Sequence, residues 1–161
     1  KTNNTLEPYI TAFFSKVITR GINENGDVSI GENDDEDLKE SNQKSRKNKI
    51  DSTPIEVSQI CDLVYELYQI CPNNVKDLLP HVEFKLKSSE VKERCEYTKL
   101  LARLFSDKNS ELAKNHPESW RSFLGRFKDI SVSVRVRCVQ YSMHFLVNHP
   151  ELIDDITEQL R

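Results

Sequence analysis

The chain has 161 residues, of which 37% are hydrophobic and 30% are charged, and its formal net charge at pH 7 is −3. This length is enough for one domain with a true core. No stretch approaches the roughly 20 apolar residues of a membrane span, and no signal-peptide pattern opens the chain, so we expect an intracellular protein with no membrane contact.

The first predicted helix runs from Leu6 to Arg20, with Pro8 tolerated in its first turn and Gly21 as its stop. The segment that follows, at about 22–51, has no apolar period and carries nine acidic residues against five basic ones. Such a composition cannot bury enough surface to order itself. We predict a disordered, charged insertion loop there, and a docking arm or nuclear address is the alternative.

The second predicted helix extends from Pro54 to Ile70, with Thr53 as its N-cap. The third, Asn73 to Lys87, should be kinked at Pro80, because proline removes an amide donor and crowds the carbonyl four residues back. Glu90 to Phe105 is the fourth helix, and the tight turn before it pairs it with the third.

The last three predicted helices follow a polar connector, which holds one short turn at 110–114. They are Pro117 to Phe127, Ser133 to Val147, and a final helix that Pro150 opens. Gly125 marks a close helix contact or a weak point in the first of them. Seven helices in antiparallel pairs make about three and a half repeats.

An internal repeat supports this arrangement. A valine followed four residues later by a cysteine recurs at Val57/Cys61, Val91/Cys95 and Val134/Cys138, at spacings of 34 and 43 residues. Periods of this size are typical of helical solenoids, in which each helix pair must stack on a neighbour. A kinked first helix favours HEAT repeats over tetratricopeptide repeats. We therefore predict an all-α fold, an α-solenoid of HEAT repeats, as a single domain over residues 1–161.

The sequence lacks the motifs of an enzyme. It has no phosphate-binding glycine-rich loop, no nucleophile elbow and no His/Cys metal array. None of its four cysteines is in CxxC spacing, which favours reduced, buried thiols, and three of the four lie at the predicted seam between repeats. We expect a protein without catalytic activity, cofactor or metal, and its uncapped ends indicate a fragment of a longer chain.

Basic residues in turns or on the outer faces of the repeats are the candidate binding residues. They are Lys85, Lys87, Lys92, Arg94, Arg126, Arg135 and Arg137. We expect them to stack along one edge of the solenoid as a basic ridge, which suits acidic peptides, phosphates or nucleic acid. The alternative is that they are ordinary turn residues, with Asp129 and Arg135 joining adjacent repeats. Because the sequence pI is about 5.9, contact with DNA ranks second to a protein partner.

Six blocks in order resemble one known family. They are LEPYITAFF, VYELYQICP, LLPHVEFKLKSSEVKERC, KLLARLFSDKNSELA, SWRSFLGRFKDISVSVRVRCV and NHPEL. Together they closely resemble the cohesin-associated Pds-five (precocious dissociation of sisters) regulators. The resemblance implies a piece of the N-terminal half of a curved HEAT-repeat protein, nuclear and chromatin-associated. Such proteins are not enzymes; they bind the kleisin subunit of cohesin, work with Wapl and acetylation-protecting factors, and control sister chromatid cohesion and cohesin release.

Two departures limit what the resemblance implies. The charged segment 22–51 is far longer than the link expected in the family, and the Ala-Pro-rich motif for Wapl-type ligands is absent. Wapl-type regulators are therefore expected to bind outside this fragment. Some members bind inositol phosphates, but no residue here is assigned to that ligand. Two other hypotheses compete with that of a cohesin-binding scaffold. One is a nucleic-acid or inositol-phosphate binding module that uses the basic ridge, and the other is a purely structural spacer.

Overall fold

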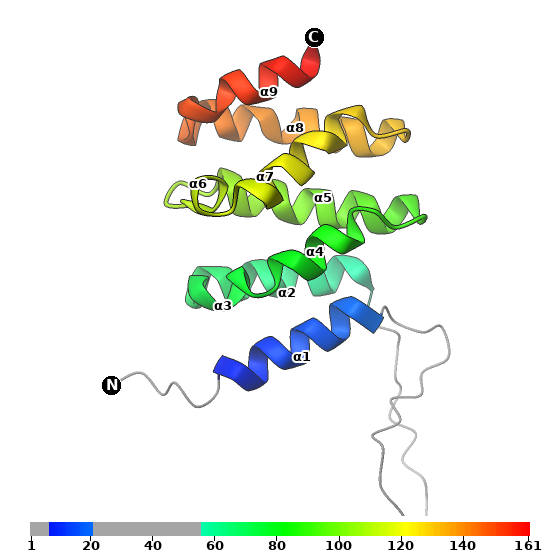
Figure 1. The fold of residues 1–161 in the computed structure, drawn as a ribbon, viewed down its shortest axis with the longest axis vertical. Coiled ribbons are helices and arrows are strands. Elements are labelled where there is room, and N and C mark those ends of the chain that lie inside the picture. Colours follow the sequence, from blue (N-terminus) through cyan, green and yellow to red (C-terminus); the bar gives the residue numbers. More distant parts are fainter. Residues whose placement is uncertain (1–6, 21–55) are drawn as a thin grey trace, which may run out of the picture.

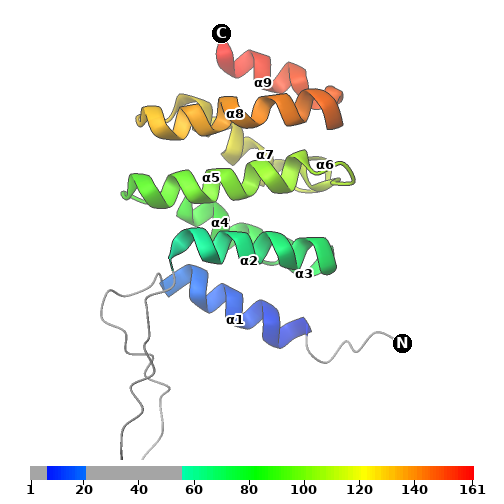
Figure 2. The same cartoon turned by 180° about the vertical axis from the view of Figure 1, so that it is seen from behind.

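The computed structural model describes residues 7–20 and 56–161. Within these ranges the chain is a stack of helices in two layers (Figures 1 and 2). One layer holds α2 (Val57–Ile70), α5 (Val91–Ser106) and α8 (Val132–Asn148). The other holds α1 (Glu7–Arg20) and the shorter helices between the long ones. The all-α solenoid predicted from the sequence is confirmed.

The shorter helices of the other layer are broken at defined points. They are α3 (Pro72–Lys76), α4 (Leu79–Lys85), α6 (Leu112–Asn115), α7 (Pro117–Leu124), the 3₁₀ helices η1 (Gly125–Lys128) and η2 (Pro150–Leu152), and α9 (Ile153–Leu160). If α3 and α4 count as one broken helix, α6, α7 and η1 as another, and η2 and α9 as a third, the described part holds the seven predicted helices. The paired arrangement is therefore that of three and a half repeats.

One predicted detail of these helices is wrong, and one of the two alternatives for Gly125 is excluded. The expected kink within one helix at Pro80 is instead a full break at Asp77 and Leu78, and Pro80 lies in the first turn of α4, where its missing amide donor costs nothing. Gly125 marks the change from α7 to η1, and a Cβ added there would meet nothing within 4 Å. No close helix contact requires the glycine.

The start of α2 is fixed by its own side chains. The Glu56 carboxylate and the Gln59 side chain form a capping box, in which the Glu56 N–H donates to Gln59 Oε1 at 2.9 Å. The expected cap Thr53 and the predicted insertion loop at about 22–51 both lie outside the described residues.

Aromatic packing joins the two layers in the C-terminal half. Trp120 of α7 stacks on Phe123, with ring centroids 5.5 Å apart, and contacts Phe105 of α5 at 5.3 Å and Phe145 of α8 at 5.5 Å. Its indole N–H donates to Asp155 of α9 at 2.8 Å. The buried indole therefore has the partner that it needs, and four helices are held at one point.

The cysteines are free thiols, as predicted, and Cys61, Cys95 and Cys138 are buried. Burial raises the pKa of all three above the ordinary thiol value. These three groups therefore stay protonated and act as small packing residues.

Candidate protein-binding surface

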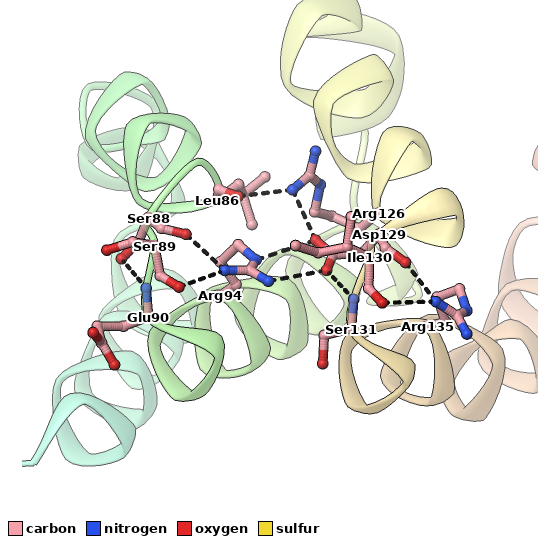
Figure 3. A network of polar contacts seen from close by, with 10 residues as sticks. All are labelled: Leu86, Ser88, Ser89, Glu90, Arg94, Arg126, Asp129, Ile130, Ser131 and Arg135. Carbon is pink, nitrogen blue, oxygen red and sulfur yellow. Dashed lines mark hydrogen bonds and ion pairs between the residues drawn. The ribbon is translucent and has the colours of Figure 1, made fainter.

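A polar cluster that is buried at its centre and partly exposed at its edges occupies the turns that precede α5 and α8 (Figure 3). We call it the turn network and define it by Arg94, Arg126, Asp129 and Arg135. Arg94 Nε and Nη2 donate to the two carboxylate oxygens of Asp129, at 3.2 and 3.1 Å. Since Arg94 belongs to α5 and Asp129 to the next repeat, this bidentate pair ties two repeats together.

Arg94 also holds its own turn. Its Nη1 donates to the backbone carbonyls of Ser88 at 2.8 Å and Ser89 at 3.0 Å. Arg135 repeats this arrangement in the next unit, because its Nη1 donates to the carbonyls of Asp129 at 2.6 Å and Ile130 at 3.2 Å. Each arginine thus satisfies backbone acceptors of the turn just before its helix.

Asp129 lies at the centre of the turn network. It accepts from Arg126 Nη1 at 3.0 Å and from the Ser131 N–H at 2.8 Å, in addition to Arg94. Burial by itself would raise the pKa of Asp129, but the hydrogen bonds from Arg94 and Ser131 and the charges of Arg94 and Arg126 lower that pKa below its ordinary value. The carboxylate is therefore held ionised.

Arg126 extends the network into the preceding repeat. Its Nη1 donates to the Leu86 carbonyl, which ends α4, at 2.9 Å. We expected Asp129 and Arg135 to join adjacent repeats. Within the described residues the side-chain joint is instead Arg94 with Asp129, while Arg135 donates to backbone carbonyls of its own turn.

The remaining ridge candidates differ in exposure. Lys85 is buried and pairs with Glu93 at 2.8 Å, so neither Lys85 nor Arg94 is on an outer face as expected. Lys92 is exposed and lies 3.6 Å from Glu56. Lys87 is exposed, and no ion pair joins it to another described residue. The seven candidates therefore do not form one exposed ridge.

Arg137 lies in a different place, in an open groove of about 640 Å³ where α2, α5 and α8 lie side by side. We call it the second-helix groove. It is lined in part by Tyr65, Arg103, Lys108, Arg137, Tyr141 and His144, and by one carboxylate, Asp107, which accepts hydrogen bonds from Tyr65 and Gln69. The Arg103 guanidinium lies 3.8 Å from the centre of the Tyr65 ring, and Arg103 also pairs with Asp62. These contacts fix its position.

The groove also offers basic side chains that carry no close acidic partner. Within the described ranges, neither Arg137 nor Lys108 lies within 4 Å of a carboxylate, and Arg137 contacts only the Gln140 amide, at 3.4 Å. Tyr141 and His144 stack with ring centroids 5.4 Å apart. Cationic and aromatic side chains of this kind suit an extended acidic segment of a protein.

Of the residues that line this groove, only Arg137 is among the candidates predicted from the sequence. The groove residues come from α2, from α5 with the turn after it, and from α8, which lie far apart in the chain, so no local spacing indicates them. The described part holds no cluster of three or more His, Cys, Asp or Glu that could hold a metal ion. Nor does that part include a helix with the length and apolar character needed to cross a membrane.

Comparison with known proteins agrees with the quoted sequence blocks. The family model of the sister chromatid cohesion protein PDS5 matches residues 1–161. The whole chain aligns at 38% identity with PDS5 homolog B-A of Xenopus laevis and at 37% with PDS5 homolog B of Homo sapiens, covering 9% of each. It aligns at 37% with PDS5 homolog A of Danio rerio, covering 10% of that protein.

The chain thus spans about a tenth of the length of the curated relatives that it matches. Every part of it, including the residues outside the described ranges, falls within the family match. The chain belongs to the PDS5 family of sister chromatid cohesion proteins.

Proposed function

We propose that this chain is a non-enzymatic scaffold segment of a nuclear, chromatin-associated cohesin regulator, and that it contributes to sister chromatid cohesion and to control of cohesin release. The observation that carries the proposal is the turn network. In a ligand-binding site, arginine and aspartate side chains would face the ligand. Here Arg94, Arg126 and Asp129 bind groups of the protein and hold adjacent repeats together. A solenoid whose joints are fixed presents a surface of constant shape.

The partner is the kleisin subunit of cohesin, and its contact is the second-helix groove. Arg137 and Lys108 supply positive charge for acidic residues, while Tyr141 supplies a flat apolar surface. Lys87 and Lys92 are secondary contacts at the exposed edge. Wapl-type regulators bind parts of a full-length protein outside residues 1–161.

A phosphate or nucleic-acid ligand on the basic ridge is less well supported. Arg94, Arg126 and Arg135 already donate to protein acceptors, which leaves fewer donors for phosphate oxygens. Nucleic-acid affinity depends on many such contacts. The groove is therefore the better place to look for a partner.

The test is binding of purified kleisin to the 161-residue chain. A groove variant, Arg137→Glu with Lys108→Glu, is compared with an edge variant of equal charge change, Lys87→Glu with Lys92→Glu. We expect the groove variant to lose most of its affinity and the edge variant to lose little. Circular dichroism of each variant controls for folding.

The other outcomes separate the alternatives. Equal loss in both variants, together with a steep dependence on salt, favours a diffuse electrostatic surface and the nucleic-acid or inositol-phosphate alternative. Full binding by both variants places the kleisin contact elsewhere on the chain. No binding by wild type leaves the segment as a structural spacer.

A further inference from the structure

The basic side chains of the second-helix groove that lack an acidic partner lie at its two ends. Arg137 lines one end, on the side of α8 that faces the groove. Eleven residues further along α8, Asn148 Nδ2 donates to the Ser106 carbonyl at 2.8 Å, which places the end of α5 and the exposed Lys108 after it at the other end. At a rise of about 1.5 Å per residue, the two ends are about 16 Å apart.

The centre of the groove differs from its ends. Arg103 lies there, but an ion pair and an aromatic ring already hold its guanidinium. Tyr141 and His144 stack on each other and follow Arg137 at four and seven residues, so all three lie on one side of α8. The centre therefore offers a flat aromatic surface, which suits an apolar or aromatic side chain.

The two ends are not equally positive. Asp107 lies at the Lys108 end. Its Oδ2 accepts from Gln69 at 3.0 Å and from Tyr65 at 3.5 Å, and its Oδ1 accepts from the Asn109 N–H at 3.1 Å. These contacts hold the carboxylate in place but leave its negative charge next to the lysine. The opposite end of the groove is therefore the more positive of the two.

Polar amides along the groove favour an extended occupant. Gln140 and Asn148 both line it, and side-chain amides can donate and accept hydrogen bonds. An extended segment has backbone N–H and C=O groups free to bond with them, whereas a helix pairs those groups internally. Because an extended chain rises about 3.3 Å per residue, roughly five residues cover the distance between the ends.

We propose that the second-helix groove selects its partner by the spacing of two acidic residues. The partner segment is extended, its two acidic residues stand about four to six positions apart, and an apolar or aromatic residue lies between them. One acidic residue binds Arg137, the other binds Lys108, and the middle side chain packs on Tyr141. This inference rests on the proposed function, because it specifies the kind of kleisin segment that the groove accepts.

The first test measures the affinity of labelled synthetic peptides for the 161-residue chain, by fluorescence polarisation at low salt. Each peptide carries two glutamates and a tyrosine between them in a glycine–serine background, and only the spacing of the glutamates varies, from two to twelve positions. We expect binding at four to six positions to be about threefold tighter than at two. An affinity without this optimum, an optimum near eleven as a helical segment would give, or no binding by any peptide overturns the proposal.

A charge exchange tests the two ends separately. Arg137→Glu should lower the affinity for the best peptide by about fivefold, and Lys108→Glu should lower it less, because Asp107 already offsets part of the positive charge at that end. Two further peptides each replace one glutamate by lysine, and one of them should regain affinity for Arg137→Glu. Arg121→Glu, at an exposed position of α7 outside the groove, is the control and should bind like wild type. If neither lysine peptide regains affinity, the proposal is wrong.

The kleisin measurement separates the failure of this inference from the failure of the proposed function. If kleisin loses affinity for the groove variant but the peptides show no preferred spacing, the groove is the contact and the spacing rule is wrong. If the peptides show the expected spacing but kleisin binds the groove variant fully, the spacing rule holds and the partner is another protein with such a segment.

Discussion

The two groups of charges in the turns of this solenoid look alike in sequence but have different physical roles. The side chains of Arg94 and Asp129 are 6% and 2% exposed and bind each other across two repeats. The side chain of Lys92 is 73% exposed, two residues before Arg94 in the same helix. The difference teaches that helix phase and the number of available acceptors, not charge, decide whether a turn residue serves the fold or the surface.

The largest effect should come from removing the carboxylate at the centre of the turn network. Asp129→Ala leaves Arg94 buried without its ionic partner, and breaking a buried pair in this way costs about 3–5 kcal/mol. We expect the free energy of unfolding in urea to fall by that order. Lys128→Ala, at the exposed neighbouring position, is the matched control and should change little.

A double variant separates the unpaired charge from the loss of packing. Arg94→Met with Asp129→Leu removes both charges, so it should be less destabilising than Asp129→Ala alone. If the double variant is the less stable of the two, then losing the hydrogen bonds from Arg94 to the carbonyls of Ser88 and Ser89 costs more than leaving Arg94 without its ionic partner.

A smaller effect should follow when the charge is kept and the shape is changed. Arg94→Lys cannot contact both Asp129 oxygens and two turn carbonyls at once, so we expect a loss of about 1–3 kcal/mol. Arg135→Lys loses only hydrogen bonds to backbone carbonyls and should cost about 1 kcal/mol. Equal losses at the two positions, measured by urea unfolding, would contradict the special role given to the pair between repeats.

The next smaller effect should be the contribution of ionised Asp129 to the pH dependence of stability. Its pKa is lowered in the folded state from an ordinary value of 3.8, so the stabilisation is complete above that value and is lost as pH falls through the folded pKa. Thermal unfolding at pH 6 and pH 3 should show a larger fall in Tm for wild type than for Asp129→Asn, which does not titrate at this position. An equal fall in Tm for both proteins would show that Asp129 does not cause the loss of stability at low pH.

The smallest effect on stability should come from replacing the exposed lysines. Lys87→Ala and Lys92→Ala should change the free energy of unfolding by less than about 0.5 kcal/mol. Lys92 has only a solvent-exposed partner at 3.6 Å. A loss above 1 kcal/mol, by the same urea measurement, would show that these lysines belong to the fold.

Sequence reasoning predicted the helices better than their joints. Apolar periodicity marks a helix face directly, so the seven helical segments and their order followed from it. Arg94 and Arg135 hold their turns in the same way and are 41 residues apart, so α5 and α8 are related by 41 residues rather than by the 43 of the Val/Cys pattern. The pattern misleads because buried faces are broad, and a cysteine fits at more than one angle around a helix. Cys138 is in fact equivalent to Tyr97, and both are buried.

The site was less predictable than the fold for a related reason. Arg94 and Lys92 have the same charge and lie two residues apart in one helix, and only the positions of Asp129 and the turn carbonyls decide which of them is buried. The groove around Arg137 depends on three helices lying side by side. The burial of Arg94 and the groove around Arg137 both result from packing between repeats, which cannot be predicted from a local sequence pattern.

The position of Trp120 has an optical consequence. It is the only tryptophan of the chain, and it contacts Phe105, Phe145 and Asp155 where α5, α7, α8 and α9 meet. Its fluorescence emission therefore reports the integrity of that junction, whereas circular dichroism averages over every helix. Because solenoids can unfold in parts, a difference between the two melting curves would measure how independently the end of the stack at α1 and α2 comes apart.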